Sequence, residues 1–211
     1  MNKFEIYLIR HGKTIANEKK LYCGKTDLSL SDLGKKELKE LNIKYPKCDL
    51  YFTSGAKRAN ETLKILFGNV DYIKLLDFFE YNFGDFEMKS YEELKENKLY
   101  IEWILDKEGK VSCPNGESKE VYKNRIKKEF IRFLNEANNS NIEKVALVCH
   151  GGTIGTILEE FYDNSKSFYE HQPSCGEGYK LIINKTNETL KIINVEEIKS
   201  NRKQDKNIWR D

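Results

Sequence analysis

The sequence has no long apolar run and no excess of charge of either sign. No stretch approaches the ~20 apolar residues of a membrane-spanning helix, and the opening segment MNKFEIYLIR, with an acidic residue inside its apolar run, does not resemble a signal peptide. The 36 Lys and Arg residues nearly balance the 34 Asp and Glu residues, for a formal net charge of +2. We therefore expect a cytoplasmic protein without a broad surface for nucleic acid or membrane, in which any anion site is local.

Clusters of cysteine and histidine that would bind zinc are also missing. The five cysteines are widely separated without a C-x-x-C motif, and none of the three histidines lies at ligand spacing to a cysteine pair. Free thiols and no metal are therefore expected. The 211 residues contain no internal repeat, and their number suits one domain with a substantial core.

Strand-like and helical patterns alternate along the chain. Strands are predicted over 4–9, 49–53, 71–76, 144–149, 178–183 and 190–195. Helices are predicted after Ser31, over 57–67, from about Glu117, and after the glycines at 151 and 152. This order predicts an α/β fold, a three-layer sandwich with a mainly parallel central sheet that ends in an antiparallel hairpin around NKTNET.

Residues 77–116 interrupt the alternation. They contain helical pieces without a clear strand, and we interpret them as a cap inserted over one end of the sheet. The chain is thus predicted to form one domain over 1–200, cap included, followed by a polar tail at 201–211. His171, in the polar stretch EHQPSCGEG, is expected in an exposed loop.

The first and fourth predicted strands each end in a histidine that a glycine follows, His11 and His150. In open α/β sheets, ligands collect beyond the carboxyl ends of the strands. Arg10 precedes the first of these histidines, and Arg58 begins the predicted helix after the second strand. Two planar guanidiniums can clamp a phosphate, and the backbone at Gly151 can approach the same oxygens.

These residue types suit transfer of a phosphoryl group. A phosphate monoester is close to dianionic at neutral pH, so two guanidiniums would neutralise it while a neutral imidazole attacks the phosphorus. One histidine would be the nucleophile, and the other would donate to the transferring oxygens. Glu80, among aromatic residues after the third strand, is the candidate acid for the leaving group, the alternative being a surface glutamate.

In their order along the chain these motifs resemble those of the histidine phosphatase superfamily, whose fold is phosphoglycerate mutase-like. The resemblance covers residues 4 to about 183 through LIRHGKT, the arginine motif TSGAKRANET, CPNGES and VCHGG. It implies that His11 becomes phosphorylated, that Arg10, Arg58 and His150 bind the phosphate, and that Glu80 donates the proton. The other candidate phosphate- or substrate-binding residues are Thr14, Asn17, Tyr22, Gly24, Glu117, Ser118 and Gly151.

Two motifs depart from the family pattern. The family's phosphatases usually have Trp-Glu-Gly where this chain has Phe86-Glu87-Met88, and the usual Ser-Pro of the arginine motif is Ser54-Gly55. We expect both departures to alter loop shape and to leave the chemistry intact.

The favoured function is hydrolysis of a small-molecule phosphate monoester without a cofactor. A cofactor-dependent phosphoglycerate mutase would need a second anion site, and no arginine occurs between Glu80 and Gly116. A non-catalytic phosphate-binding module is the other alternative, although the chain retains both nucleophile and acid. A cysteine phosphatase built on Cys149 is excluded because position 155 is glycine, where that chemistry requires arginine.

Within the superfamily, LYCGKTDLSLSDLG and the chain length are most similar to alpha-ribazole phosphatases, which remove a 5′-phosphate late in cobalamin nucleotide-loop assembly. Alpha-ribazole 5′-phosphate is therefore a candidate substrate. Aromatic residues near the site would either form a wall for its flat base or pack the cap onto the sheet. These residues are Tyr22, Tyr81, Phe83, Phe86 and Trp103. A monomer and a homodimer are both compatible with the sequence.

Overall fold

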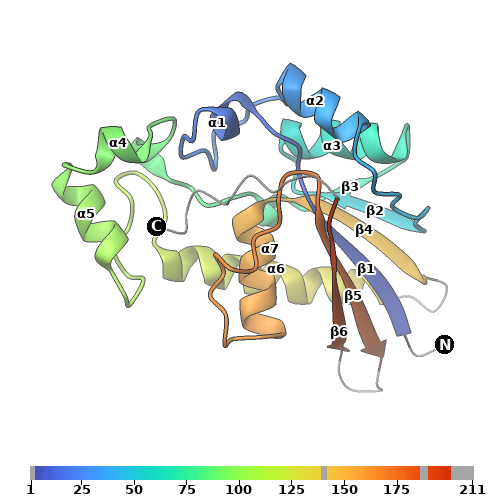
Figure 1. Cartoon of the computed structure of the whole chain (residues 1–211). Coiled ribbons are helices and arrows are strands. Elements are labelled where there is room, and N and C mark those ends of the chain that lie inside the picture. The colour runs from blue at the N-terminus through green and yellow to red at the C-terminus, as the bar shows by residue number, and fades with distance from the viewer. Residues whose placement is uncertain (1–2, 139–141, 186–189, 201–211) are drawn as a thin grey trace.

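The computed structural model describes residues 3–138, 142–185 and 190–200, in which a six-stranded sheet occupies the centre of the molecule (Figure 1). The strands are β1 (Lys3–Arg10), β2 (Leu50–Thr53), β3 (Ile73–Lys74), β4 (Lys144–Cys149), β5 (Gly178–Lys185) and β6 (Leu190–Ile198).

The sheet order is β3-β2-β4-β1-β5-β6, and its first four strands are parallel. β5 is antiparallel to β1, and β6 is antiparallel to β5. The predicted mainly parallel sheet with a closing antiparallel pair is thus confirmed. The last four residues of the predicted connector NKTNET (186–189) and the predicted tail at 201–211 lie outside the described residues.

Alternation of side chains along the strands divides the core between the two faces of the sheet. Ile6 and Leu8 of β1 belong to one apolar cluster with residues of α6 (Lys119–Ala137) and α7 (Gly151–Phe161). Tyr7 and Ile9 belong to a second cluster with residues of α3 (Lys57–Phe67). Helices therefore cover both faces (Figure 1), as the predicted three-layer sandwich requires.

The predicted helices form where the capping residues and apolar periodicity place them. The Ser31 hydroxyl accepts a hydrogen bond from Gly34 N (3.0 Å) at the start of α2 (Asp32–Lys39). α3 has the predicted bounds, and α6 buries the apolar side chains that its sequence pattern assigns to one face. α7 begins at Gly151 itself, directly after β4.

The predicted strand over 71–76 was too long. β3 contains only Ile73 and Lys74, both exposed at the edge of the sheet. Leu75 N still donates to Thr53 O (2.8 Å), but a 3₁₀ turn over Leu76–Phe78 then carries the chain away from the sheet.

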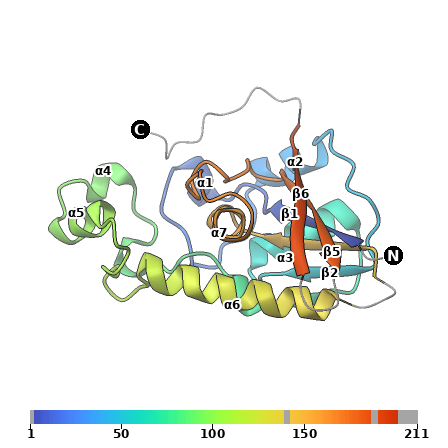
Figure 2. The same cartoon turned by 90° about the horizontal axis from the view of Figure 1, so that it is seen from below.

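The described part of residues 77–116 contains only short helical elements. These are the 3₁₀ turn Gly84–Phe86, α4 (Tyr91–Leu94) and α5 (Lys98–Leu105). In Figure 2, α4 and α5 lie away from the sheet, beside the N-terminal end of α6. The interpretation of this segment as a cap within a single domain over 1–200 stays a prediction.

The aromatic residues near the site pack against one another. The rings of Tyr22 and Trp103 lie 6.0 Å apart, those of Phe86 and Trp103 lie 5.9 Å apart, and Trp103 Nε1 donates to the Tyr81 hydroxyl (2.9 Å). All four of these side chains are buried. Their packing favours the second of the two interpretations, in which the rings attach the cap to the rest of the fold.

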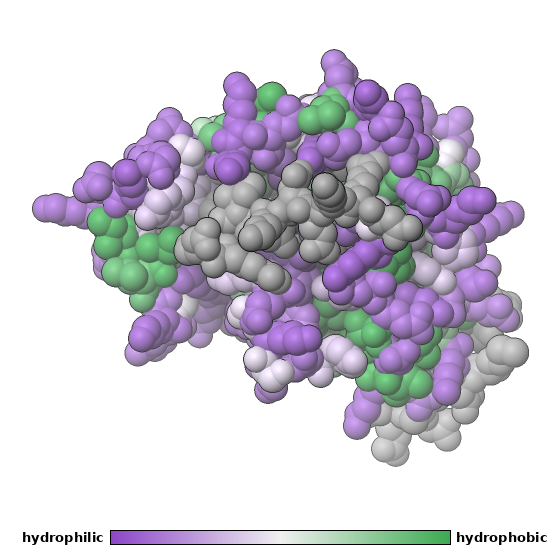
Figure 3. All heavy atoms as spheres, in the orientation of Figure 1, coloured by the Kyte–Doolittle hydropathy of each residue, from purple (hydrophilic) through white to green (hydrophobic). Residues whose placement is uncertain are grey.

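The opposite face of α5 is exposed and apolar. Leu99, Ile101, Ile104 and Leu105 are 54%, 38%, 40% and 70% exposed. The green spheres at the left edge of Figure 3 lie where Figure 1 places this helix. No described helix combines the length and apolar composition needed to cross a membrane.

The prediction that His171 is an exposed loop residue was wrong. Its side chain is only 5% exposed, and its Nε2 lies 3.0 Å from the carbonyl oxygen of Asp163. The loop after α7 folds back on that helix so closely that a Cβ at Gly155 would lie 2.2 Å from Phe168 O. This contact buries a residue whose polar neighbours suggested exposure.

Two adjacent residues of α6 test the packing of this helix. Phe130 is fully buried and Ile131 is 52% exposed. We expect Phe130→Ala to lower the free energy of unfolding by about 3–5 kcal/mol, because it removes apolar contacts and leaves a cavity. Ile131→Ala should cost less than about 1 kcal/mol. Urea denaturation of both variants measures the difference, and equal losses would contradict this placement of α6.

Candidate active site

The two histidines that end strands in the predicted pattern lie side by side. β1 and β4 are adjacent and parallel, with Arg10 paired to Cys149, so the residues that follow them emerge at the same edge of the sheet. The ring centroids of His11 and His150 are 5.2 Å apart, with an interplanar angle of 66°. Both rings are buried. The convergence expected from the strand order is therefore present.

The surroundings of His11 suit a neutral nucleophile. Its Nδ1 lies 2.7 Å from the carbonyl oxygen of Gly12. Because a carbonyl oxygen only accepts, Nδ1 must carry the ring hydrogen, which leaves the lone pair on Nε2. Burial lowers the pKa of His11 well below its usual value, and the charges of Arg58 and Arg10 lower that pKa further. The ring is therefore neutral near pH 7.

The surroundings of His150 suit a hydrogen-bond donor. Its Nε2 lies 2.8 Å from Ser54 Oγ, and its Nδ1 is buried without a hydrogen-bond partner among the described residues. Burial also lowers the pKa of His150 well below its usual value, and the charge of Arg58 lowers that pKa further. A serine hydroxyl that donates to Nε2 leaves the hydrogen of the neutral ring on Nδ1. Ser54 was not among the candidate residues, although its place at the end of β2 was visible in the sequence.

The guanidinium of Arg58 is held by backbone oxygens. Its side chain is 1% exposed, and it donates to the carbonyls of Gly24 (2.7 Å) and Thr26 (3.0 Å). Its Cζ also lies 5.5 Å from the centre of the Phe79 ring. No carboxylate among the described ion pairs neutralises this buried charge, which makes an anionic ligand favourable beside it.

Arg10 approaches the same place from β1. Its Nη1 donates to Pro173 O (2.7 Å), and its Nε is buried without a partner among the residues described. A Cβ at position 151 would lie 3.0 Å from the Arg10 Cζ. Glycine at the start of α7 therefore lets the guanidinium pass close to the backbone.

Three donors fix the carboxylate of Glu80. Its Oε1 accepts from Tyr81 N (3.0 Å) and from the Tyr122 hydroxyl (2.6 Å), and its Oε2 accepts from Gly152 N (2.9 Å) in the first turn of α7. Burial and the charge of Glu80 raise the pKa of Tyr122 well above its usual value, so the hydroxyl keeps its hydrogen. Tyr122 was not among the candidate residues, and its contact with Glu80 makes it part of this site.

Several other candidate residues make structural contacts. The Thr14 and Asn17 side chains cap α1 (Ile15–Glu18), and Thr14 N donates to Asn17 Oδ1 (2.9 Å). Ser118 caps α6 by accepting from Val121 N (3.2 Å). Tyr22 belongs to the aromatic cluster of the cap. The contacts described for these residues do not include either histidine of the pair.

Glu117 is paired with an arginine that the sequence did not single out. Arg125 donates to both carboxylate oxygens of Glu117, each at 2.8 Å. It also donates to the backbone oxygens of Asp77 (2.7 Å) and Phe79 (2.9 Å). The pair therefore fixes the segment that leads to Glu80.

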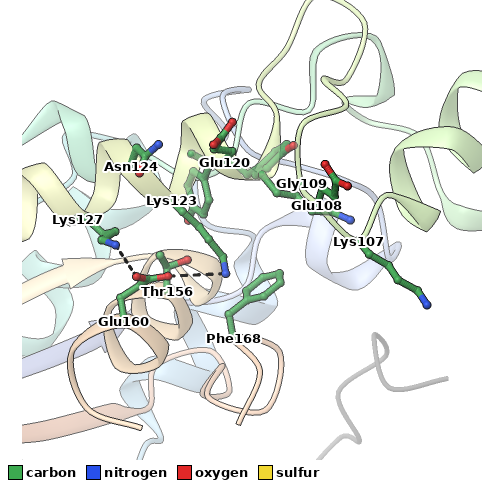
Figure 4. A pocket seen from close by; sticks show the side chains of 13 residues that line it. Lys107, Glu108, Gly109, Glu120, Lys123, Asn124, Lys127, Thr156, Glu160 and Phe168 are labelled. Carbon is green, nitrogen blue, oxygen red and sulfur yellow. Dashed lines mark ion pairs between the residues drawn. The ribbon is translucent and has the colours of Figure 1, made fainter. Parts of the chain in front are cut away.

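The hollow shown in Figure 4 shares Tyr122 with the surroundings of Glu80. It has a volume of about 260 Å³ and lies between α6, α7 and the loop at 107–109. Lys127 and Lys123 form ion pairs with Glu160 across it (2.7 and 3.8 Å). Its described lining includes Tyr122 but neither histidine of the pair and neither arginine of the proposed phosphate site. The candidate phosphate-binding residues Arg10, His11, Arg58 and His150 are therefore not part of the lining of this hollow.

Comparisons with known proteins agree with this geometry. The family model of the Histidine phosphatase superfamily (branch 1) matches residues 6–194. The adenosylcobalamin/alpha-ribazole phosphatase of Escherichia coli (strain K12) is 25% identical over 198 residues, which are 90% of this chain and 95% of that protein.

Two solved structures share the fold. The alpha-ribazole phosphatase from Shigella flexneri matches with a TM-score of 0.75 and 23% identity, over 93% of this chain and 96% of the other. Phosphoglycerate mutase from Thermus thermophilus matches with a TM-score of 0.67 and 22% identity, over 93% of this chain and 99% of the other. The fold is thus phosphoglycerate mutase-like, and the chain belongs to the histidine phosphatase superfamily.

Proposed function

We propose that this protein is a phosphatase that hydrolyses a small-molecule phosphate monoester through a phosphohistidine on His11. The observation that carries the proposal is the pair of buried, unpartnered nitrogens, His150 Nδ1 and Arg10 Nε, among the described residues of the site. Both belong to residues that surround His11. Buried polar groups are normally hydrogen-bonded, so these two nitrogens favour a bound anion.

In the first step, the lone pair on His11 Nε2 attacks the phosphorus and forms a P–N bond. The bond between phosphorus and the leaving oxygen breaks, and that oxygen takes a proton from the carboxylic acid form of Glu80. The two guanidiniums and His150 Nδ1–H donate to the three transferring oxygens. Removing one such donor typically costs about 10²–10³ in rate.

In the second step, water attacks the phosphohistidine and the P–N bond breaks. The carboxylate of Glu80 takes the proton of the water, and the pair of electrons returns to His11 Nε2. Phosphate leaves, and Glu80 is again protonated for the next cycle. The fixed contacts of Glu80 with Tyr122 and Gly152 would hold it in place through both steps.

The candidate substrate is alpha-ribazole 5′-phosphate, supported by the relatives that are named adenosylcobalamin/alpha-ribazole phosphatase. The buried cap aromatics offer little free ring face for the base of this compound. A screen of phosphorylated metabolites should include this compound, together with 3-phosphoglycerate and its bisphosphate cofactor as the test for a mutase.

The first expected outcome concerns the nucleophile. The unmodified protein should hydrolyse p-nitrophenyl phosphate in the presence of a metal chelator, and His11→Ala should lower kcat by at least about 10³-fold because the covalent step is lost. His171→Gln is the matched control and should keep most of the activity. Binding of phosphate without any turnover by the unmodified protein would favour the non-catalytic module instead.

The second outcome concerns protonation. The folded pKa of His11 lies below its unfolded value of ~6.5, so the ring should stay neutral as the pH falls through 6.5 and gain a proton only at lower pH. Stability should therefore decline below about pH 6.5, by up to about 1.4 kcal/mol per pH unit for this ring, because the unfolded state binds the proton first.

NMR of the ring nitrogens measures this directly. At pH 7 the His11 signals should show a neutral ring with its hydrogen on Nδ1, as the contact with the Gly12 carbonyl requires. A ring that titrates near pH 6.5 or above, or one with its hydrogen on Nε2, would contradict the assignment.

A further inference from the structure

A carboxylate that the proposed mechanism does not use, that of Glu87, lies between two segments of the site. It accepts hydrogen bonds from three consecutive backbone N–H groups, those of Gly24, Lys25 and Thr26, at 2.9–3.2 Å. It also accepts one from Phe83 N at 3.1 Å. Four backbone donors on one carboxylate make a strong, charge-assisted anchor.

The loop that Glu87 binds is the loop that holds Arg58. The N–H groups of Gly24 and Thr26 face the carboxylate, while the carbonyl oxygens of the same two residues accept from the Arg58 guanidinium at 2.7 and 3.0 Å. The short loop thus lies between a negative and a positive side chain. The peptide group between Gly24 and Lys25 donates its N–H to Glu87 and accepts from Arg58 through its C=O, so its dipole is aligned with both charges. If the carboxylate is lost, the loop loses the contact that fixes the direction of these carbonyls.

The loop is also joined to the helix that carries Arg58. Asp27 Oδ1 accepts from Lys57 N at 2.7 Å, at the first residue of α3. Ala56, at the N-cap position, makes no side-chain cap. The loop therefore caps the helix as well as binding the guanidinium.

On its other side, Glu87 holds the segment that follows Glu80. Glu87 accepts a hydrogen bond from the N–H group of Phe83, which lies three residues after Glu80. The two segments are in direct contact, since a Cβ at Gly24 would lie 1.5 Å from the carbonyl oxygen of Tyr81. One carboxylate thus joins the segment of the proposed acid to the loop of the phosphate-binding arginine.

The backbone next to Glu87 is fixed in an unusual conformation. Met88 has φ 60°, in the left-handed region that favours glycine, and its N–H donates to Tyr22 O at 2.7 Å. Tyr22 N in turn donates to Lys89 O at 2.9 Å. These bonds hold the turn despite the methionine and keep Glu87 directed at the loop.

We propose that Glu87 is a positioning residue of the phosphatase site, which fixes the Arg58 guanidinium relative to Glu80. The inference rests on the proposed function, in which Arg58 binds the phosphate and Glu80 donates the proton.

The test compares Glu87→Gln with Glu92→Gln. The first keeps the size of the side chain but replaces one of the two acceptor oxygens with an NH2 group, which donates and cannot accept from a backbone N–H. Glu92 is a matched control on α4, with a side chain 72% exposed and an ion pair to Lys95. Titration calorimetry with inorganic phosphate and kinetics with p-nitrophenyl phosphate are measured on both, with thermal unfolding as the check on folding.

Glu87→Gln should weaken phosphate binding and lower kcat/KM by about tenfold or more, whereas Glu92→Gln should stay within about twofold of the unmodified protein. In an Arg58→Lys background, the added loss from Glu87→Gln should shrink to less than about threefold, because both changes act on the same group. A merely structural role would lower the unfolding temperature without this coupling.

A folded Glu87→Gln protein with unchanged phosphate affinity and kcat/KM would overturn the proposal. So would a Glu87→Gln change that lowers kcat/KM by the same factor in the Arg58→Lys background as in the unmodified protein. If Glu87→Gln does not fold, Glu87→Asp, which keeps the charge and shortens its reach, takes its place in the same comparison. A protein that binds phosphate but hydrolyses nothing would refute the proposed phosphatase activity. The role of Glu87 would still be tested, because calorimetry measures phosphate binding without turnover.

Discussion

The parallel pairing of β1 with β4 is the constraint on which the site depends. The register that sets Arg10 opposite Cys149 ends both strands at the same level, so His11 and His150 follow side by side. β2 pairs with the other edge of β4 and brings Ser54 to the same level, where it meets the second imidazole. A slip of one residue in either pairing would turn one of these side chains to the opposite face of the sheet.

The electrostatics of the site follow from how its charges are held. In the described part of the chain, Arg10 and Arg58 are bound by backbone carbonyls and form no ion pair with a carboxylate. Their positive charge is therefore positioned without being neutralised by these contacts. That charge and burial together keep both imidazoles neutral near pH 7. The carboxylates of Glu80 and Glu87 are held in turn by backbone N–H groups. The site therefore places two guanidiniums beside a neutral His11 imidazole, an arrangement that suits an anionic ligand such as a phosphate.

Much of the fold and the centre of the site could be predicted from the sequence, because both depend on local patterns. Strand ends mark where side chains meet in a parallel sheet, and helix periodicity marked the buried face of α6. Sequence patterns could not predict the contacts made by four other side chains, those of Ser54, Tyr122, Arg125 and Glu87. Each joins residues that are far apart in the chain through a single side-chain geometry, which periodicity does not encode. The burial of His171 was missed because the loop that contains it folds back on α7, a tertiary contact that the polar neighbours of His171 in the sequence do not indicate.

The most direct measurement is to trap the covalent intermediate. The protein is mixed with a ³²P-labelled phosphate monoester, quenched in alkali, in which phosphohistidine is stable, and digested for peptide mapping. The account predicts acid-labile label on the peptide that contains His11, and none in a His11→Asn variant. Full hydrolytic activity without any phosphate bound covalently at His11 would contradict it.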